Sequence, residues 1–306
     1  MTDRLMLLDT ASMYFRAFFG VPEIKAPNGT PVNAVRGLLD FISRLVGEYQ
    51  PDHLVCCWDN DWRPQWRVDL VPTYKSHRGE YVVKGEHPYV EEVPDPLEVQ
   101  VPIIQAVLAA YGICVIGKDG YEADDVIGSL ATQADMPVDV VTGDRDLFQL
   151  VDDKSEVRVL YVARGVGNHE RVTDHVVVEK YAVLPSQYAD FATMRGDASD
   201  GLPGVPGVGE KTASALLLKY GDLRGIIAAA ENPDSDMAPS PRKKILAAED
   251  YLKVAPTVVE VARDIKLGRF DATLPSKPAH PQNLELLAAH YNLGSAVPRL
   301  IDVLAG

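Results

Sequence analysis

Apolar residues in the first two-thirds of the chain form short continuous runs that alternate with amphipathic segments. The runs predict strands at 4–9, 53–59, 113–117, 138–143 and 157–162. Between them, apolar residues recur at helical spacing at about 11–19, 33–49, 97–111, 122–134 and 145–151. Such alternation is typical of a mainly parallel sheet covered by helices on both faces. The pattern therefore predicts an α/β fold whose ligands collect beyond the carboxyl ends of the strands.

The last third of the chain shows helical spacing alone. Helices are predicted at 185–195, 210–220, about 222–230 and 241–253. A polar stretch with prolines, ENPDSDMAPSP, interrupts them and is typical of a loop. After Pro256, the segment TVVEVARDIKLG is apolar enough to return to the first region, and a short helical tail follows. The sequence thus predicts an α/β region followed by a helical one.

Acidic residues follow four of the predicted strands, and two more stand in GDASDGLPG at the entrance to the helical region. An acid after one strand, or in the first turn of one helix, is usually explained by capping and the helix dipole. Four strands that deliver acids to one sheet edge favour a shared site instead. The candidate set is Asp9, Asp59, Glu122, Asp124, Asp125, Asp144, Asp146, Asp197 and Asp200.

The charge of this set points to metal ions. Nine carboxylates near one another cannot all stay ionised without cations. Oxygen ligands without His or Cys select hard ions, so Mg²⁺ or Mn²⁺ is expected, and the number of acids indicates two ions or more. The formal net charge of −14 opposes long-range attraction to nucleic acid. Metals at the acidic edge would cancel that field locally.

The glycine-rich stretch GLPGVPGVGEKT, at 201–212, is not the phosphate loop of an ATPase. Gly204 and Gly209 have the required spacing, but Glu210 stands where a lysine must follow and no strand precedes. A dinucleotide fingerprint fails because its third glycine is missing. Two interpretations remain. One is a hairpin whose amides approach phosphates at a helix start, with Lys211 adding charge; the other is a helix C-cap followed by a proline turn.

Composition excludes several classes of protein. The 306 residues are 46% hydrophobic and 24% charged, as in ordinary globular proteins. No apolar run approaches a membrane span, and the first residues do not resemble a signal peptide. Cys56, Cys57 and Cys114 lie in apolar runs without CxxC spacing, so we expect buried, reduced thiols. These features predict a cytoplasmic protein without membrane association.

Three strings carry a resemblance to a known family. GYEADDVIG, TGDRDLFQLV and GDASDGLPGVPGVGEKTA are similar to those of bacterial and phage 5′-nucleases. These are the flap endonuclease/5′–3′ exonuclease family, which includes the N-terminal domain of DNA polymerase I. The resemblance runs from Leu7 to about residue 270, and the chain looks like the freestanding form, since no polymerase region follows.

The resemblance implies a fold and an activity. A PIN-like catalytic core would span 1–180, with a helical arch at about 63–96. A helix–hairpin–helix (H3TH) DNA-binding region would span 181–270, and 271–306 would pack back on the core. The activity would be metal-dependent hydrolysis of DNA phosphodiesters at 5′ flaps, 5′ overhangs and nicked or gapped duplexes, in replication and repair.

The resemblance also assigns roles to the acids and to residues of the arch. Asp9, Asp59, Glu122 and Asp124 would serve a first metal, and Asp144, Asp146, Asp197 and Asp200 a second, with Asp125 between or behind them. Lys75 and Arg78 would lie above the metals, Tyr74 would stack on a base, and Arg16 would contact a phosphate. Without the resemblance, a solvated helix face would be the preferred explanation of Lys75 and Arg78. Residues 79–96 are acidic where an arch is expected to be basic.

In the helical region, the resemblance implies contacts with the duplex backbone. The basic run of Arg242, Lys243 and Lys244 would touch phosphates, although a solvated helix start also explains it. A potassium ion held by carbonyls of 204–209 is a further implication of the family. The remaining hairpin contacts would come from Gly204, Gly207, Gly209, Lys211 and Thr212.

Two rival functions stay open. One is a single-strand ribonuclease built on a similar acidic sheet, which the duplex-gripping hairpin argues against. The other is a binding protein for branched DNA without catalysis, which the complete acid set argues against.

Overall fold

A six-stranded sheet forms the centre of the molecule. The computed structural model describes residues 3–81, 89–91 and 95–306. The strand order is β5-β2-β1-β6-β7-β8, and all neighbours are parallel except β7 and β8. The parallel α/β prediction is therefore confirmed. The strands are β1 (Leu5–Asp9), β2 (His53–Trp58), β5 (Cys114–Gly117), β6 (Val138–Thr142), β7 (Val157–Tyr161) and β8 (Glu170–Val172).

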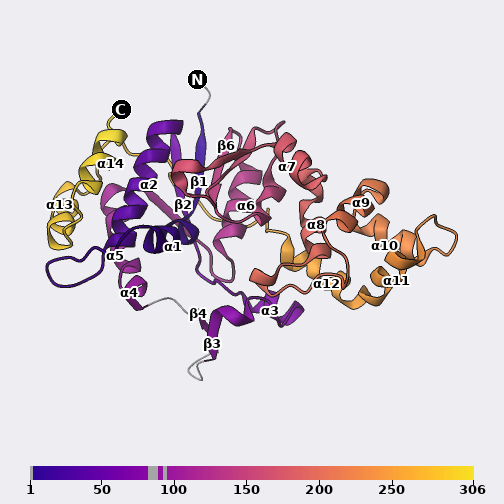
Figure 1. Cartoon of the computed structure of the whole chain (residues 1–306). Coiled ribbons are helices and arrows are strands. Elements are labelled where there is room, and N and C mark those ends of the chain that lie inside the picture. Colours follow the sequence, from indigo (N-terminus) through magenta and orange to yellow (C-terminus); the bar gives the residue numbers. More distant parts are fainter. Residues whose placement is uncertain (1–2, 82–88, 92–94) are drawn as a thin grey trace.

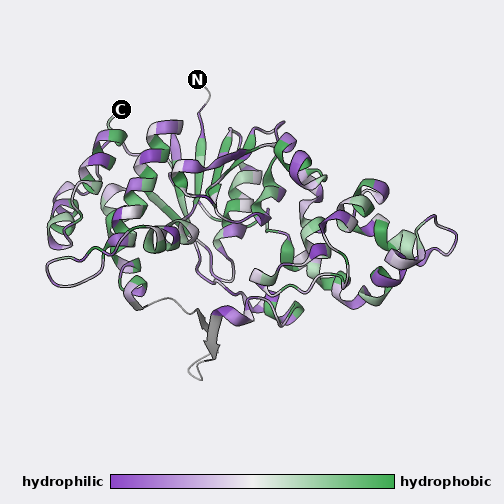
Figure 2. Cartoon of the chain, in the orientation of Figure 1, coloured by the Kyte–Doolittle hydropathy of each residue, from purple (hydrophilic) through white to green (hydrophobic). Residues whose placement is uncertain are grey.

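Alternate residues of four central strands enter two cores, one on each face of the sheet. Met6 and Leu8 pack into one core, whereas Leu5 and Leu7 pack into the other. Figure 2 shows the apolar strands between helices with polar outer faces. The first core is covered by α1 (Thr10–Gly20), α2 (Asn33–Tyr49), α4 (Asp95–Glu98), α5 (Val101–Tyr111), α13 (Pro281–His290) and α14 (Ala296–Leu304). The second is covered by α6 (Ala123–Gln133), the 3₁₀ helix η2 (Asp146–Leu150) and α7 (Asp174–Tyr181).

The helical region lies beside the sheet and continues the second core (Figure 1). Its helices are α8 (Tyr188–Arg195), α9 (Glu210–Tyr220), α10 (Leu223–Glu231), α11 (Pro239–Ala247) and α12 (Glu249–Val259). The prediction of one helix at 241–253 is wrong, because the backbone breaks at Ala248 and divides it into α11 and α12.

The chain then returns to the α/β region, as its apolar pattern predicts. The return begins at Glu260, since α12 runs past Pro256. Val261 N–H donates to Gln149 Oε1 at 3.0 Å, and Ile265 N–H donates to Ser129 Oγ at 3.2 Å. Helices α13 and α14 follow and pack against α5 and α2 (Figure 1).

The described residues between β2 and α4 form a projection beside the carboxyl edge of the sheet (Figure 1). It contains α3 (Gln65–Leu70), the 3₁₀ helix η1 (Ser76–Arg78) and the antiparallel strands β3 (Gly79–Tyr81) and β4 (Tyr89–Glu91). Residues 82–88 and 92–94 of the expected arch lie outside the described residues. Over the ranges that the structure describes, no helix is long and apolar enough to cross a membrane.

Candidate active site

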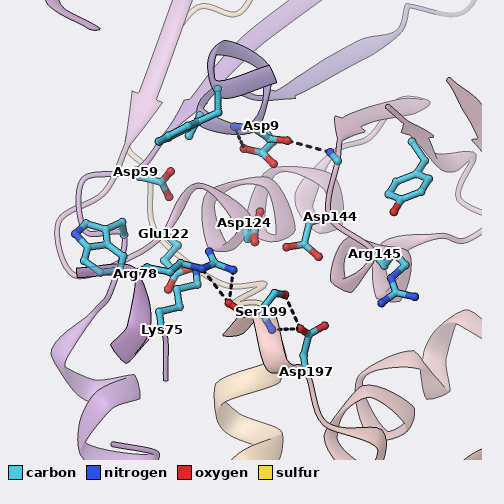
Figure 3. A pocket seen from close by; sticks show the side chains of 16 residues that line it. Asp9, Asp59, Lys75, Arg78, Glu122, Asp124, Asp144, Arg145, Asp197 and Ser199 are labelled. Atoms are coloured by element: carbon cyan, nitrogen blue, oxygen red, sulfur yellow. Dashed lines mark hydrogen bonds and ion pairs between the residues drawn. The ribbon is translucent and has the colours of Figure 1, made fainter. Parts of the chain in front are cut away.

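A cavity of about 320 Å³ opens at the carboxyl edge of the sheet, and six acidic side chains line it (Figure 3). They come from the ends of β1 and β2, the start of α6, the turn after β6 and the segment after α8. Because the strands are parallel, residues that are distant in sequence meet at this edge. The six are Asp9, Asp59, Glu122, Asp124, Asp144 and Asp197.

Asp9 combines capping with a place in the cavity wall. Ser12 N–H donates to its Oδ1 at 3.1 Å, and Thr142 Oγ1 donates to its Oδ2 at 2.7 Å. Burial, together with the charge of nearby Asp59, raises the pKa of Asp9 to about 7. Asp9 therefore serves both as the cap of a helix and as part of the cavity wall.

Asp59 and Asp124 also carry unfavourable charge. Ala123 N–H donates to Asp59 Oδ1 at 2.7 Å, which joins the end of β2 to the start of α6. Burial raises the pKa of Asp59. Burial, followed by the charges of Asp9 and Asp144, raises the pKa of Asp124 well above its usual value. These carboxylates need protons or cations to be stable.

The three acids at the start of α6 point in different directions. Glu122 and Asp124 line the cavity, whereas Asp125 is fully buried away from it. Arg67 Nη1 and Nη2 donate to the two oxygens of Asp125 at 2.7 Å each, and the amides of Glu122 and Ala262 also donate to it. This corrects the expectation that Asp125 serves a metal, because protein donors already occupy its carboxylate.

Asp144 and Asp146 follow β6. Asp144 lines the cavity, and its Oδ1 accepts a hydrogen bond from Asp146 N–H at 2.9 Å. Asp146 begins η2 and lies behind the wall. Its buried Oδ1 has no hydrogen-bond partner among the described residues, and burial raises its pKa well above the usual value. Such an orphaned carboxylate oxygen is rare, and it fits a nearby cation.

The negative charges of Asp197 and Asp200 are better compensated by neighbouring donors than those of Asp9 and Asp124. Although burial raises the pKa of Asp197, hydrogen bonds from Ser199 outweigh it and lower the pKa overall. Asp200 lies behind the wall and pairs with Arg78 at 2.6 Å. The acid set thus consists of six side chains on the wall and two behind it, with Asp125 elsewhere.

The donors of this site are all oxygen atoms, which fits Mg²⁺ or Mn²⁺. Within the described part of the chain, no three His, Cys, Asp or Glu side chains converge closely enough to enclose one ion. A metal here would keep several water ligands between itself and the carboxylates, as Mg²⁺ usually does.

Three cationic side chains line the same cavity, Lys75, Arg78 and Arg145. Lys75 Nζ lies 2.5 Å from Glu122 Oε2, and Arg78 also donates to Ser199 O. Burial alone would lower the pKa of Lys75, but Glu122 outweighs it and raises that pKa well above its usual value. Lys75 is only 9% exposed, which excludes a solvated helix face for this residue.

The structure corrects the expectation for Tyr74 and places Arg16 beside the site. Tyr74 is buried, and its hydroxyl donates to Glu122 Oε1 at 2.8 Å, so its ring cannot stack on a base in this conformation. Arg16 does not line the cavity. Its Nη1 donates to Ala163 O at 3.0 Å, and its Nη2 lies against the Gly143 turn.

Sequence reasoning missed several residues of the site. Arg145 and Tyr161 line the cavity, and Arg145 lies on the other side of Asp144 from Lys75 (Figure 3). The only available signal for Arg145 was its position between two acids in TGDRDLFQLV. Arg67 gave no signal, because an arginine in a short helix is ordinarily exposed.

In the helical region, the glycine-rich hairpin lies between α8 and α9. Gly204 and Gly207 have φ values of +67° and +75°, which side chains rarely adopt. An added Cβ at Gly204 would lie 2.6 Å from Gly196 N, so the turn also needs close backbone contact. Gly209 precedes α9 and gives it no side-chain cap, and Lys211 is exposed on its first turn.

The basic run of α11 divides into different roles. Arg242 donates to backbone oxygens that include those of Ala230 and Met237, which corrects the expectation that it contacts DNA. Lys244 Nζ donates to Gly207 O at 2.8 Å and supports the hairpin. Lys243 is exposed.

Comparison with protein-family models gives two adjacent matches. The N-terminal resolvase-like domain of 5′–3′ exonucleases matches residues 4–182, and their C-terminal SAM fold matches residues 183–282. A protein of Streptomyces coelicolor named 5′–3′ exonuclease is 56% identical over 98% of this chain and 99% of its own length. A 5′–3′ exonuclease of Mycobacterium tuberculosis is 48% identical over the full length of both chains. The chain belongs to the 5′–3′ exonuclease family, and it is an enzyme of the nuclease class.

More distant similarities agree with this fold. DNA polymerase I of Mycobacterium bovis is 37% identical over 98% of this chain but only 32% of the polymerase. The structure of a T5 5′-exonuclease with bound zinc covers 99% of this chain and 98% of its own, with a TM-score of 0.65 at 18% identity. The catalytic core of Rad2 in complex with DNA covers 99% and 92%, with a TM-score of 0.60 at 14% identity.

Proposed function

We propose that the protein is a structure-specific 5′-nuclease that hydrolyses DNA phosphodiesters at 5′ flaps, 5′ overhangs and nicks or gaps. The observation that carries the proposal is the cavity lined by six carboxylates together with the cations Lys75, Arg78 and Arg145. Close relatives over the whole chain are named 5′–3′ exonucleases, and a more distant structural neighbour, the catalytic core of Rad2, is a complex with DNA. Replication and repair of cytoplasmic bacterial DNA would be its setting.

Two divalent ions, Mg²⁺ or Mn²⁺, would occupy the carboxylate site. The buried, partnerless oxygen of Asp146 and the raised pKa values of Asp9 and Asp124 support this part of the proposal. Bound ions would lower the pKa of water and stabilise the leaving oxygen. The first ion would be served by Asp9, Asp59, Glu122 and Asp124, and the second by Asp144, Asp146, Asp197 and Asp200.

Side chains of the protein would hold the scissile phosphate in one orientation for attack. Lys75 and Arg78 would donate to the non-bridging oxygens as negative charge builds on them. Arg145 would approach the same phosphate from the other side of Asp144. Water attacks phosphorus and the bond to the 3′ oxygen breaks, which leaves a 5′-phosphate and a 3′-hydroxyl.

The helical region would hold the duplex without reading its sequence. The uncapped first amides of α9, with Lys211 and Thr212, would face the backbone phosphates, and Lys243 would add a further contact. A potassium ion at 204–209 would need carbonyls other than that of Gly207, which already accepts from Lys244.

The decisive experiment is cleavage of an end-labelled 5′-flap duplex with Mg²⁺, with Mn²⁺ and with chelator. We expect ion-dependent release of the flap near its junction. A band shift without cleavage under every condition would favour the branched-DNA binding protein instead. Cleavage of labelled single-stranded RNA in preference to the flap would favour the ribonuclease.

A further inference from the structure

A buried ion pair lies beneath the cavity and joins Arg67, on α3, to Asp125, on the first turn of α6. Arg67 is 2% exposed and Asp125 is fully buried. The guanidinium and the carboxylate form two hydrogen bonds of 2.7 Å. Neither residue lines the cavity, and no step of the proposed reaction uses them. Burying two charges has a desolvation cost that an apolar pair would avoid, so this pair calls for an explanation beyond stability.

The pair fixes Glu122 through both its backbone and its side chain. Asp125 Oδ2 accepts a hydrogen bond from Glu122 N–H at 3.2 Å, which completes the capping box of α6. Arg67 Nη1 also lies 3.5 Å from Glu122 Oε1. Glu122 in turn anchors Lys75 at the cavity wall. Movement of the Arg67 guanidinium would therefore move a candidate metal-site carboxylate and a candidate phosphate-binding lysine together.

The same guanidinium also reaches the end of the helical region. Arg67 Nε donates to Val258 O at 3.1 Å, and Nη2 lies 3.4 Å from Glu260 O. Asp125 Oδ1 accepts from Ala262 N–H at 2.9 Å. Helix α3 packs against α12 along this contact (Figure 1). One side chain thus joins the projection, the end of α12 and the first turn of α6.

We propose that Arg67 is a positioning residue, which holds Glu122 and Lys75 in place relative to the helices that would grip the duplex. The inference rests on the proposed function. Arginine suits the task because its planar fork makes two parallel hydrogen bonds to Asp125 while Nε reaches Val258, and a lysine ammonium cannot do both. Since Arg67 does not reach the cavity, it does not touch DNA, and it acts on turnover through ion binding and through the placement of Lys75.

The test is Arg67→Lys in the full chain, which keeps the charge but loses the fork. On the 5′-flap duplex with Mn²⁺, kcat falls about 10- to 100-fold while KM stays within about twofold. Mn²⁺ affinity, measured without DNA from the paramagnetic resonance of free Mn²⁺, falls about three- to tenfold. Asp125→Asn produces the same changes, and the double variant is no worse than the more impaired single variant, because both remove one unit.

The chain offers a control ion pair at the other end of the sheet. Asp139, on β6, is also fully buried, and Arg158 Nε donates to its Oδ1 at 2.6 Å. Arg4 Nη1 donates to the same oxygen at 2.9 Å, and the Arg158 side chain is 28% exposed. Arg158→Lys therefore lowers the urea midpoint of unfolding less than Arg67→Lys does, when both are measured in chelator. It leaves kcat and Mn²⁺ affinity at wild-type values.

The outcomes separate the two levels of the proposal. An Arg67→Lys protein that loses stability but keeps wild-type Mn²⁺ affinity and kcat overturns the positioning role. A fall in kcat that is fully explained by the fraction of unfolded protein also overturns the positioning role. Failure of the wild-type chain to bind Mn²⁺ or to cut any flap overturns the proposed function, and this inference with it.

Discussion

Two crowded acids of the cavity contrast with a paired surface acid of the helical region. In the cavity, Asp9 is buried and Asp124 partly buried beside other carboxylates, and desolvation raises the pKa of both. In the helical region, Asp236 accepts hydrogen bonds from Lys219 and Tyr220, which lower its pKa. A buried cluster in which carboxylates outnumber cations is built to bind cations, whereas balanced surface charges contribute little beyond solubility.

Basic side chains show the same division. Lys75 and Arg78 pair with acids at the cavity. Arg242 and Lys244 donate to backbone carbonyls, so their role is to hold loops. Under the proposed function, similar residue types would therefore support catalysis in one region and architecture in the other, and variants should separate the two.

The largest effect is expected from Asp146→Asn in the cavity. Cleavage of the flap duplex should fall about a thousandfold or more, because the second ion loses a charged partner. Stability in chelator should not fall, since the variant removes a buried carboxylate with a partnerless oxygen. Flap cleavage, duplex binding and urea unfolding check this. Activity close to wild type would remove Asp146 from the metal site.

The pH dependence of stability is the second expected difference. Asp9 has a raised pKa of about 7 in the folded chain against 3.8 when unfolded. Its protonated form therefore stabilises the fold at acidic pH, and this stability, on the order of a few kcal/mol, is lost as pH rises from about 4 through 7. In chelator, unfolding free energy should fall over that window, and Asp9→Asn should flatten the slope. If the unfolding free energy of the wild type does not fall over this pH range, the raised pKa of Asp9 is contradicted.

Arg242→Ala should lower the stability of the protein without changing its rate of DNA cleavage. The variant loses hydrogen bonds to the carbonyls of the 230–237 loop, and the unfolding free energy should fall by about 1–2 kcal/mol. Turnover at saturating flap DNA should remain unchanged where the protein is folded. A selective loss of DNA affinity at full stability would restore Arg242 as a DNA contact.

Lys243→Ala should give the smallest effect. The side chain is exposed, so stability should stay within about 0.5 kcal/mol of wild type. If Lys243 contacts one phosphate, the dissociation constant for duplex should rise a few-fold and the salt slope of log affinity should decrease by about one. Binding isotherms at several salt concentrations measure both, and unchanged isotherms would leave Lys243 as a solvated residue.

Several structural elements could be predicted because their signals are local. The five parallel strands are apolar runs, and the carboxyl ends of such strands must meet at one edge. Strand β8, by contrast, was missed because the three residues Glu170–Val172 are too few to show a period. The break at Ala248 was missed because both α11 and α12 continue the same apolar spacing.

The sequence by itself determined the α/β class, the return of the chain after α12 and the delivery of acids to one edge, because periodicity and strand direction depend on local order. The tertiary structure decided which acids face the cavity. The three acids at the start of α6 point in different directions, because Arg67, on a helix distant in sequence, forms an ion pair with Asp125. Tyr74 is buried because its hydroxyl donates a hydrogen bond to Glu122. Such choices depend on partners far away in sequence, and only the folded chain brings those partners together.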